Sequence, residues 1–138
     1  YEQLMTAATA PGELSATALL YLAVLHGAIG HGFERLQHVF DVVQAARGAA
    51  GPIDPPALGR LAAATSGSLA VEAALLLTGR IVGDPATLAL AREVRCGAKA
   101  RGLAAILGRA TTLEAQGAKR RRHSWRRQLF RELLVQLS

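Results

Sequence analysis

The chain is poor in the residues that build strands, disulfides and membrane spans. Its 138 residues include one cysteine, one tryptophan, two tyrosines and three phenylalanines. A single cysteine, Cys96, excludes an internal disulfide, and we expect it to be a small buried side chain in a reducing compartment such as the cytoplasm. The most apolar run, residues 16–30, has about 15 residues, whereas a membrane-spanning helix needs roughly 20. We therefore expect no transmembrane segment.

The residues that are abundant favour helix. Hydrophobic residues make up 51% of the chain and charged residues 19%, and the apolar part is mostly alanine and leucine. These two residues are strong helix formers, while the β-branched and aromatic residues that favour strands are scarce. We predict an all-α fold, a bundle of about six helices with no sheet, in one domain spanning residues 1–138. Residues 1–14 should form an irregular N-terminal segment and residues 119–138 a basic amphipathic helix. Since the chain begins with Tyr1 and no signal peptide follows, we expect it to be a fragment of a longer protein.

Three helix starts can be recognised from capping residues. Ser15 is a candidate N-cap for a helix reaching about Ile29, and the pairs Asp54-Pro55 and Asp84-Pro85 are typical of an N-cap followed by proline in the first turn. Ser68 is a further candidate N-cap, for a helix that Gly83 should end before Asp84. We expect the helix that begins at Pro85 to continue to Gly108.

The clearest amphipathic segment is a helix predicted from Phe33 to about Arg47. At 100° per residue its apolar side chains fall in one half of the helix and its polar side chains in the other. The apolar half contains Phe33, Leu36, Val39, Phe40, Val42, Val43 and Ala46, and the polar half contains His31, Glu34, Gln37, His38, Asp41 and Gln44, with Arg35 on the border. The polar half is either a cluster capable of acid–base chemistry or an ordinary solvated surface.

Metal and catalytic motifs are not apparent. His26, His31 and His38 are five and seven residues apart, and no histidine pair has the i, i+4 spacing of a helical zinc motif. No two acidic residues have the Asp-x-Asp spacing that two-metal phosphoryl transfer requires. We therefore expect neither a metal site nor a catalytic residue in this chain.

The positive charge is concentrated near the C-terminus. The net charge is +6, but seven basic residues and no acid lie between Lys119 and Arg131, and the rest of the chain is close to neutral. Candidate contacts to phosphates or other anions are Arg120, Arg121, Arg122, Arg126 and Arg127. This segment could bind nucleic acid, with Trp125 stacking on a base, or an anionic membrane surface, or it could be a helix whose arginines face water.

The stretch from Leu19 to Asp41, LLYLAVLHGAIGHGFERLQHVFD, resembles the helical region of the uncharacterised nucleotidyltransferase-like family within the polymerase-β superfamily. In that family an apolar helix ending near His-Gly precedes a helix of the form Arg-Leu-x-Trp-x-x-Asp. His31-Gly32, Arg35-Leu36 and Asp41 match this pattern, while His38 stands where the family usually has tryptophan and Phe40 replaces an aliphatic residue. Gly83-Asp84-Pro85 and Trp125-Arg126-Arg127 are also similar in placement.

The resemblance implies a function that this chain would not perform alone. The superfamily's active site, a Gly-Ser or Gly-Gly turn followed by Asp-x-Asp on a sheet, is not in these residues, so the chain would be a helical region downstream of a catalytic domain. Its expected partners are that domain and a nucleotide or acceptor substrate, with His31, Arg35, His38 and Asp41 facing the substrate. A cofactor, Mg²⁺, is expected only with the catalytic domain. The alternatives are a nucleic-acid-binding module that uses the basic C-terminal helix and a structural protein–protein interaction domain.

Overall fold

The fold is an all-α bundle, which confirms the predicted class. The computed structural model describes residues 8–10, 13–94, 97–117 and 125–137, and side chains over residues 14–94, 97–108 and 128–136. Within these ranges there are seven α-helices and one π-helix, η1. They are α2 (Ala16–Leu25), η1 (His26–Gly30), α3 (Leu36–Ala46), α4 (Pro55–Ala64), α5 (Ser68–Val82), α6 (Pro85–Glu93), α7 (Ala98–Gly117) and α8 (Trp125–Leu137).

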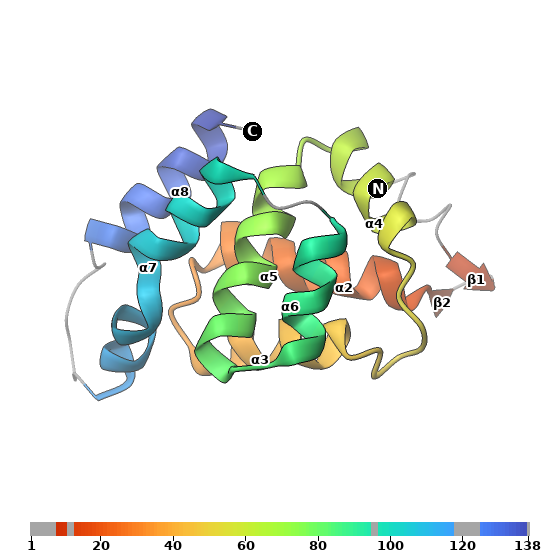
Figure 1. Cartoon of the computed structure of the whole chain (residues 1–138), viewed down its shortest axis with the longest axis horizontal. Helices are drawn as coiled ribbons and strands as arrows, with labels where there is room; N and C mark the ends of the chain where they lie inside the picture. Colours follow the sequence, from red (N-terminus) through yellow and green to blue (C-terminus); the bar gives the residue numbers. More distant parts are fainter. Residues whose placement is uncertain (1–7, 11–12, 95–96, 118–124, 138) are drawn as a thin grey trace.

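Near the N-terminus two short strands pair with each other, which the composition did not predict. Strand β1 (Ala8–Ala10) pairs antiparallel with β2 (Glu13–Leu14), and the register is irregular between Ala8 and Ala10. This pair lies at the edge of the molecule, beside the start of α2 and away from the packed helices (Figure 1). It does not change the fold class.

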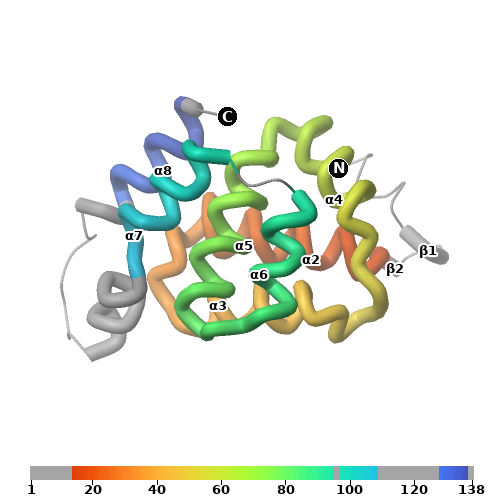
Figure 2. The backbone as a smooth tube through the Cα atoms, viewed as in Figure 1, coloured from red at the N-terminus to blue at the C-terminus, as the bar shows by residue number. Residues whose placement is uncertain are grey.

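Helix α5 is the centre of the bundle. It contacts α2, α3, α4, α6, α7 and α8 as well as η1, and both the ribbon and the tube views place it between α7 and α8 on one side and α4 on the other (Figures 1 and 2). Its central position explains its composition, because a helix surrounded by neighbours must be apolar on most of its faces. Ten of its fifteen residues are buried, from Leu69 to Ile81.

The predicted caps at three helix starts are present. The Ser15 hydroxyl accepts from the Ala18 amide at 3.1 Å, and the carboxylates of Asp54 and Asp84 accept from the amides of Ala57 and Thr87 at 3.0 and 2.8 Å. Gly83 ends α5 in the left-handed conformation, with a φ of 74°. These interactions are local, so the neighbouring sequence determines them.

Other boundaries differ from the prediction. The helix beginning at Pro85 ends at Glu93 instead of continuing to Gly108, and α7 begins separately at Ala98. Gly108, with φ 56° and ψ 165°, interrupts α7. The cap of α5 is Gly67, not Ser68. Cys96 lies outside the described residues.

None of the helices in the described part of the chain is both long enough and apolar enough to cross a membrane.

Candidate histidine site

The region between α2 and α3 departs from regular helix. Beyond Leu25 the backbone widens into the π-helix η1, in which the amide of His31 donates to the carbonyl of His26 at 3.1 Å. In an α-helix, side chains five residues apart point about 140° away from each other. In a π-helix, residues i and i+5 are joined by a backbone hydrogen bond, so one lies above the other along the helix axis and their side chains are close together. The π turn therefore places His31 next to His26.

Glycines make this turn possible. Gly27 faces Phe33, and a Cβ atom at Gly27 would lie 2.7 Å from Phe33 Cε1. The chain then reverses through Gly32 and Phe33, whose φ angles of 55° and 52° are left-handed. Phe33 is fully buried, its amide donates to the Gly27 carbonyl at 2.8 Å, and its ring is 6.5 Å from that of Phe130 in an edge-on arrangement. Burial of this ring stabilises a backbone conformation that is unfavourable for a phenylalanine.

Three imidazole rings meet at this turn. The ring centroids are 4.6 Å apart for His26 and His31, 5.3 Å for His26 and His38, and 4.5 Å for His31 and His38. The rings of His31 and His38 are stacked, with 20° between their planes, while the ring of His26 is edge-on to both. One ring nitrogen from each histidine lies within 4.8 Å of the others. We call His26, His31 and His38 the histidine cluster.

The three members differ in exposure. His26 is exposed and His31 is half-buried, whereas His38 is only 7% exposed. The Nδ1 atom of His38 is buried and has no hydrogen-bond partner. Burial lowers the pKa of His38 below its ordinary value, and the neighbouring His31 and His26 lower it further, against the opposing charges of Asp41 and Glu34. His38 is therefore neutral at physiological pH, and a neutral imidazole has one nitrogen lone pair available to a ligand.

The residues predicted to face a substrate lie in one region, but they differ in solvent exposure. His31 and His38 are in contact, Asp41 acts electrostatically on His38, and Arg35 is the exposed N-cap residue of α3. His38 was predicted in the polar half of the helix and is buried, whereas Phe40 was predicted in the apolar half and is 47% exposed. The helix begins at Leu36 and not at Phe33, and the rings of His26 and His31, from η1 and the turn that follows it, lie against His38.

The spacing of the histidines in the sequence did not predict that His26 contacts His31 and His38. The argument against a metal site rested on the absence of a histidine pair at the i, i+4 spacing of a helical zinc motif. The available signal was the sequence His-Gly-x-x-Gly-His-Gly, because glycines are poor helix formers and tolerate left-handed backbone. We interpreted this pattern as the end of a helix, and the structure shows a π turn that joins two histidines.

The anion contacts predicted in the basic segment fall where the structure gives no side chains. Arg120, Arg121 and Arg122 lie outside the described residues, and for Arg126 and Arg127 only the backbone of α8 is described. Arg131 is exposed on α8, while Phe130 and Leu134 of the same helix are buried in the core. The described part of α8 is thus amphipathic, and its binding of anions stays a prediction.

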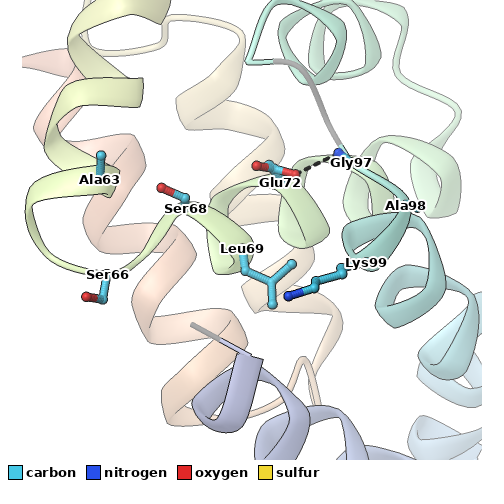
Figure 3. Close-up of a pocket in the computed structure, with 8 residues that line it drawn as sticks. All are labelled: Ala63, Ser66, Ser68, Leu69, Glu72, Gly97, Ala98 and Lys99. Carbon is cyan, nitrogen blue, oxygen red and sulfur yellow. Dashed lines mark hydrogen bonds between the residues drawn. The ribbon is translucent and has the colours of Figure 1, made fainter.

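A separate hollow of about 540 Å³ lies between the α4–α5 turn and the start of α7 (Figure 3). Its polar residues are Ser66, Ser68, Glu72 and Lys99, and the Glu72 carboxylate accepts from the Gly97 amide at 2.8 Å. That bond anchors the beginning of α7 on α5. The hollow includes no member of the histidine cluster and no residue predicted to face a substrate.

Comparison with known protein families, with curated proteins and with solved structures finds no match for this chain.

Proposed function

We propose that this chain is the helical, substrate-side region of a nucleotidyltransferase-like protein and contains no complete catalytic site. Its partners would be the catalytic domain of a longer polypeptide and a nucleotide or acceptor substrate. The observation that carries the proposal is that His31 contacts His38 of α3, on which Asp41 acts electrostatically, while Arg35 is the N-cap residue of the same helix. The resemblance rests on His31, Arg35 and Asp41 of this group.

The start of α3 has features suited to an anionic group. Arg35 is exposed at the N-cap, and no side chain makes a capping hydrogen bond there and no acid occupies the first turn. The amides at a helix N-terminus carry partial positive charge, and an arginine beside them adds a full charge with several donors. His31 is half-buried and stacks on His38, a residue of the first turn of α3. A triphosphate or a carboxylate is the kind of ligand that this arrangement favours.

Catalysis would come from the other domain. The chain has no two acidic residues at i, i+2, so the metal-bridging carboxylates of a two-metal transferase would have to be supplied from elsewhere. We expect the purified chain alone to transfer no nucleotide with Mg²⁺ or Mn²⁺. Metal-dependent turnover by this chain would contradict the proposal.

Substrate binding can be tested by NMR titration of the chain with each nucleoside triphosphate in the presence of Mg²⁺. The amide signals of residues 31–41 should shift, and Arg35→Ala should abolish the shifts because it removes the charge beside the α3 N-terminus. Arg60→Ala is the matched control, since Arg60 is an exposed arginine on α4. If no triphosphate shifts residues 31–41 at millimolar concentration, or if Arg35→Ala and wild type respond equally, the proposed substrate face is wrong.

In a polypeptide that includes the catalytic domain, Arg35→Ala and Asp41→Ala should reduce turnover much more than thermal stability. Both side chains are exposed, and substitutions at such positions usually change the unfolding free energy by about 0.5 kcal/mol or less. If Asp41→Ala lowers turnover and melting temperature together, Asp41 has a structural role and leaves the substrate face.

A further inference from the structure

We propose that His26, His31 and His38 bind one divalent transition-metal ion, with zinc as the expected metal. This inference does not depend on the proposed nucleotidyltransferase role, although His31 and His38 belong both to the histidine cluster and to the proposed substrate face. No sequence motif indicated it.

The distances between the ring nitrogens are somewhat longer than in a zinc site and would shorten when an ion binds. The three candidate ligand nitrogens lie within 4.8 Å of one another. Around a tetrahedral zinc ion with Zn–N distances of about 2.0–2.1 Å, the nitrogens would be roughly 3.3 Å apart. His26 is exposed and His31 half-buried, so both rings have room to rotate, while buried His38 provides a fixed point. Small side-chain rotations, without a change of fold, bring the nitrogens to bonding distance.

The donor set points to a transition metal and not to magnesium or calcium. Imidazole is a preferred ligand of zinc, copper, nickel and iron, whereas magnesium and calcium prefer oxygen ligands. Three histidines also leave one position of a tetrahedral ion open to water or to a ligand, as in catalytic zinc sites. Because His26 and His31 are accessible from solvent, an ion here could exchange that fourth ligand.

Acidic residues around the cluster support a bound cation. The Glu34 carboxylate lies 3.6 Å from His31 Nδ1, which leaves Nε2 of that ring for the metal. A carboxylate beside the non-ligating nitrogen of a metal-bound histidine commonly accepts a hydrogen bond from it, which orients the ring and raises its basicity. The charge of Asp41 also acts on His38. Glu34 and Asp41 together would offset part of the charge of a divalent ion.

His38 provides an independent argument. Its Nδ1 atom is buried without a partner, although buried polar atoms in proteins are nearly always hydrogen-bonded. A metal bound through this nitrogen would supply the missing interaction. The alternative is that the three rings pack together with no ligand, and this alternative predicts no stoichiometric metal binding.

The test uses the whole chain, freed of metal with a chelator and titrated with Zn²⁺ by calorimetry and with Co²⁺ by visible absorption. We expect one ion per chain, cobalt spectra typical of a four-coordinate site with three nitrogen ligands and water, and a higher melting temperature with Zn²⁺. His26→Gln, His31→Gln and His38→Gln should each weaken zinc binding by at least about tenfold, since loss of even an outer-shell partner typically costs 10–100-fold. His123→Gln is the control, because His123 is the only other histidine of the chain.

The variants at the exposed and half-buried positions keep the test decisive if His38→Gln fails to fold. His26→Gln and His31→Gln should retain the wild-type circular dichroism spectrum while losing affinity. The proposal is overturned if the wild type binds no zinc at micromolar concentration, if binding is unchanged in His26→Gln and His31→Gln, or if His123→Gln removes it.

Discussion

Asp84 connects two helices through a single carboxylate. One oxygen, Oδ2, accepts from the backbone amide and the hydroxyl of Thr87 at 2.8 and 2.6 Å and so caps α6. The other, Oδ1, accepts from Nε and a terminal nitrogen of Arg47 at 2.8 and 2.7 Å. Arg47 is the residue that follows α3, so this ion pair joins the end of α3 to the beginning of α6. Asp84 is 3% exposed, which makes each of these interactions costly to lose.

We predict that Asp84→Ala lowers the free energy of unfolding by about 2–4 kcal/mol, since it removes an N-cap and several charge-assisted hydrogen bonds. Asp54→Ala is the matched control, because Asp54 caps α4 in the same way but is exposed. Its cost should be about 0.5–2 kcal/mol, the range for a cap alone. Urea denaturation of both variants measures the difference, and equal losses would show that the Arg47 ion pair adds nothing.

The same carboxylate makes the protein sensitive to acid. Burial by itself would raise the pKa of Asp84, but the hydrogen bonds from Thr87 and Arg47 and the charge of Arg47 hold it below its ordinary value of 3.8. A lowered pKa means that the unfolded chain takes up the proton first, so the contribution of Asp84 is complete above pH 3.8 and is lost as the pH falls below it. Denaturation curves at falling pH should therefore show a smaller loss of stability for Asp84→Ala than for wild type.

At the scale of one element, η1 depends on a glycine that has no space for a side chain. Gly27→Ala should lower the free energy of unfolding by about 1–3 kcal/mol, because the new methyl group would overlap the buried Phe33 ring. Gly59→Ala is the control within α4, where nothing lies within 4 Å of a Cβ atom. That change should stabilise the protein by about 0.5–1 kcal/mol, as expected for a glycine inside a helix.

Thermal denaturation of the two glycine variants checks this pair of opposite effects. If Gly27→Ala is as stable as wild type, the close packing of η1 against Phe33 is not required, and the turn that joins His26 to His31 has another cause.

The sequence predicted those features of the helices that depend on neighbouring residues and did not predict those that depend on tertiary packing. The caps at Ser15, Asp54 and Asp84 involve residues three positions apart, so the sequence was sufficient to place them. The length of η1 and the burial of His38 depend on packing between α2, α3 and α5, which no window of sequence contains. Phe40, which the sequence placed in the apolar half, is 47% exposed.

At the scale of the whole molecule, the charge is uneven. The segment from Lys119 to Arg131 contains seven basic residues and no acid, whereas the rest of the chain is nearly neutral. If this segment binds nucleic acid, affinity for RNA or DNA should fall steeply with salt and be lost when its basic residues are changed to glutamine, because binding releases counterions. Binding to anionic vesicles, measured in parallel, would instead indicate a membrane surface.

The control for this experiment neutralises arginines elsewhere. Arg60, Arg80 and Arg92 are exposed on α4, α5 and α6, and changing them to glutamine removes charge without touching the basic segment. This variant should bind as the wild type does. If no salt-sensitive binding to RNA, DNA or vesicles is found, the segment is a helix with solvated arginines.

Composition and capping residues by themselves determined that this protein is a helical bundle, where several of its helices begin, and that its positive charge is concentrated near the C-terminus. Helix propensity, caps and net charge are properties of single residues and near neighbours, so they can be predicted from the sequence alone. Only the tertiary structure decided that His26, His31 and His38 meet and that Asp84 is paired with Arg47. These contacts join residues whose side chains approach one another only after α2, η1, α3 and α6 have packed, and the spacing along the chain does not encode that packing.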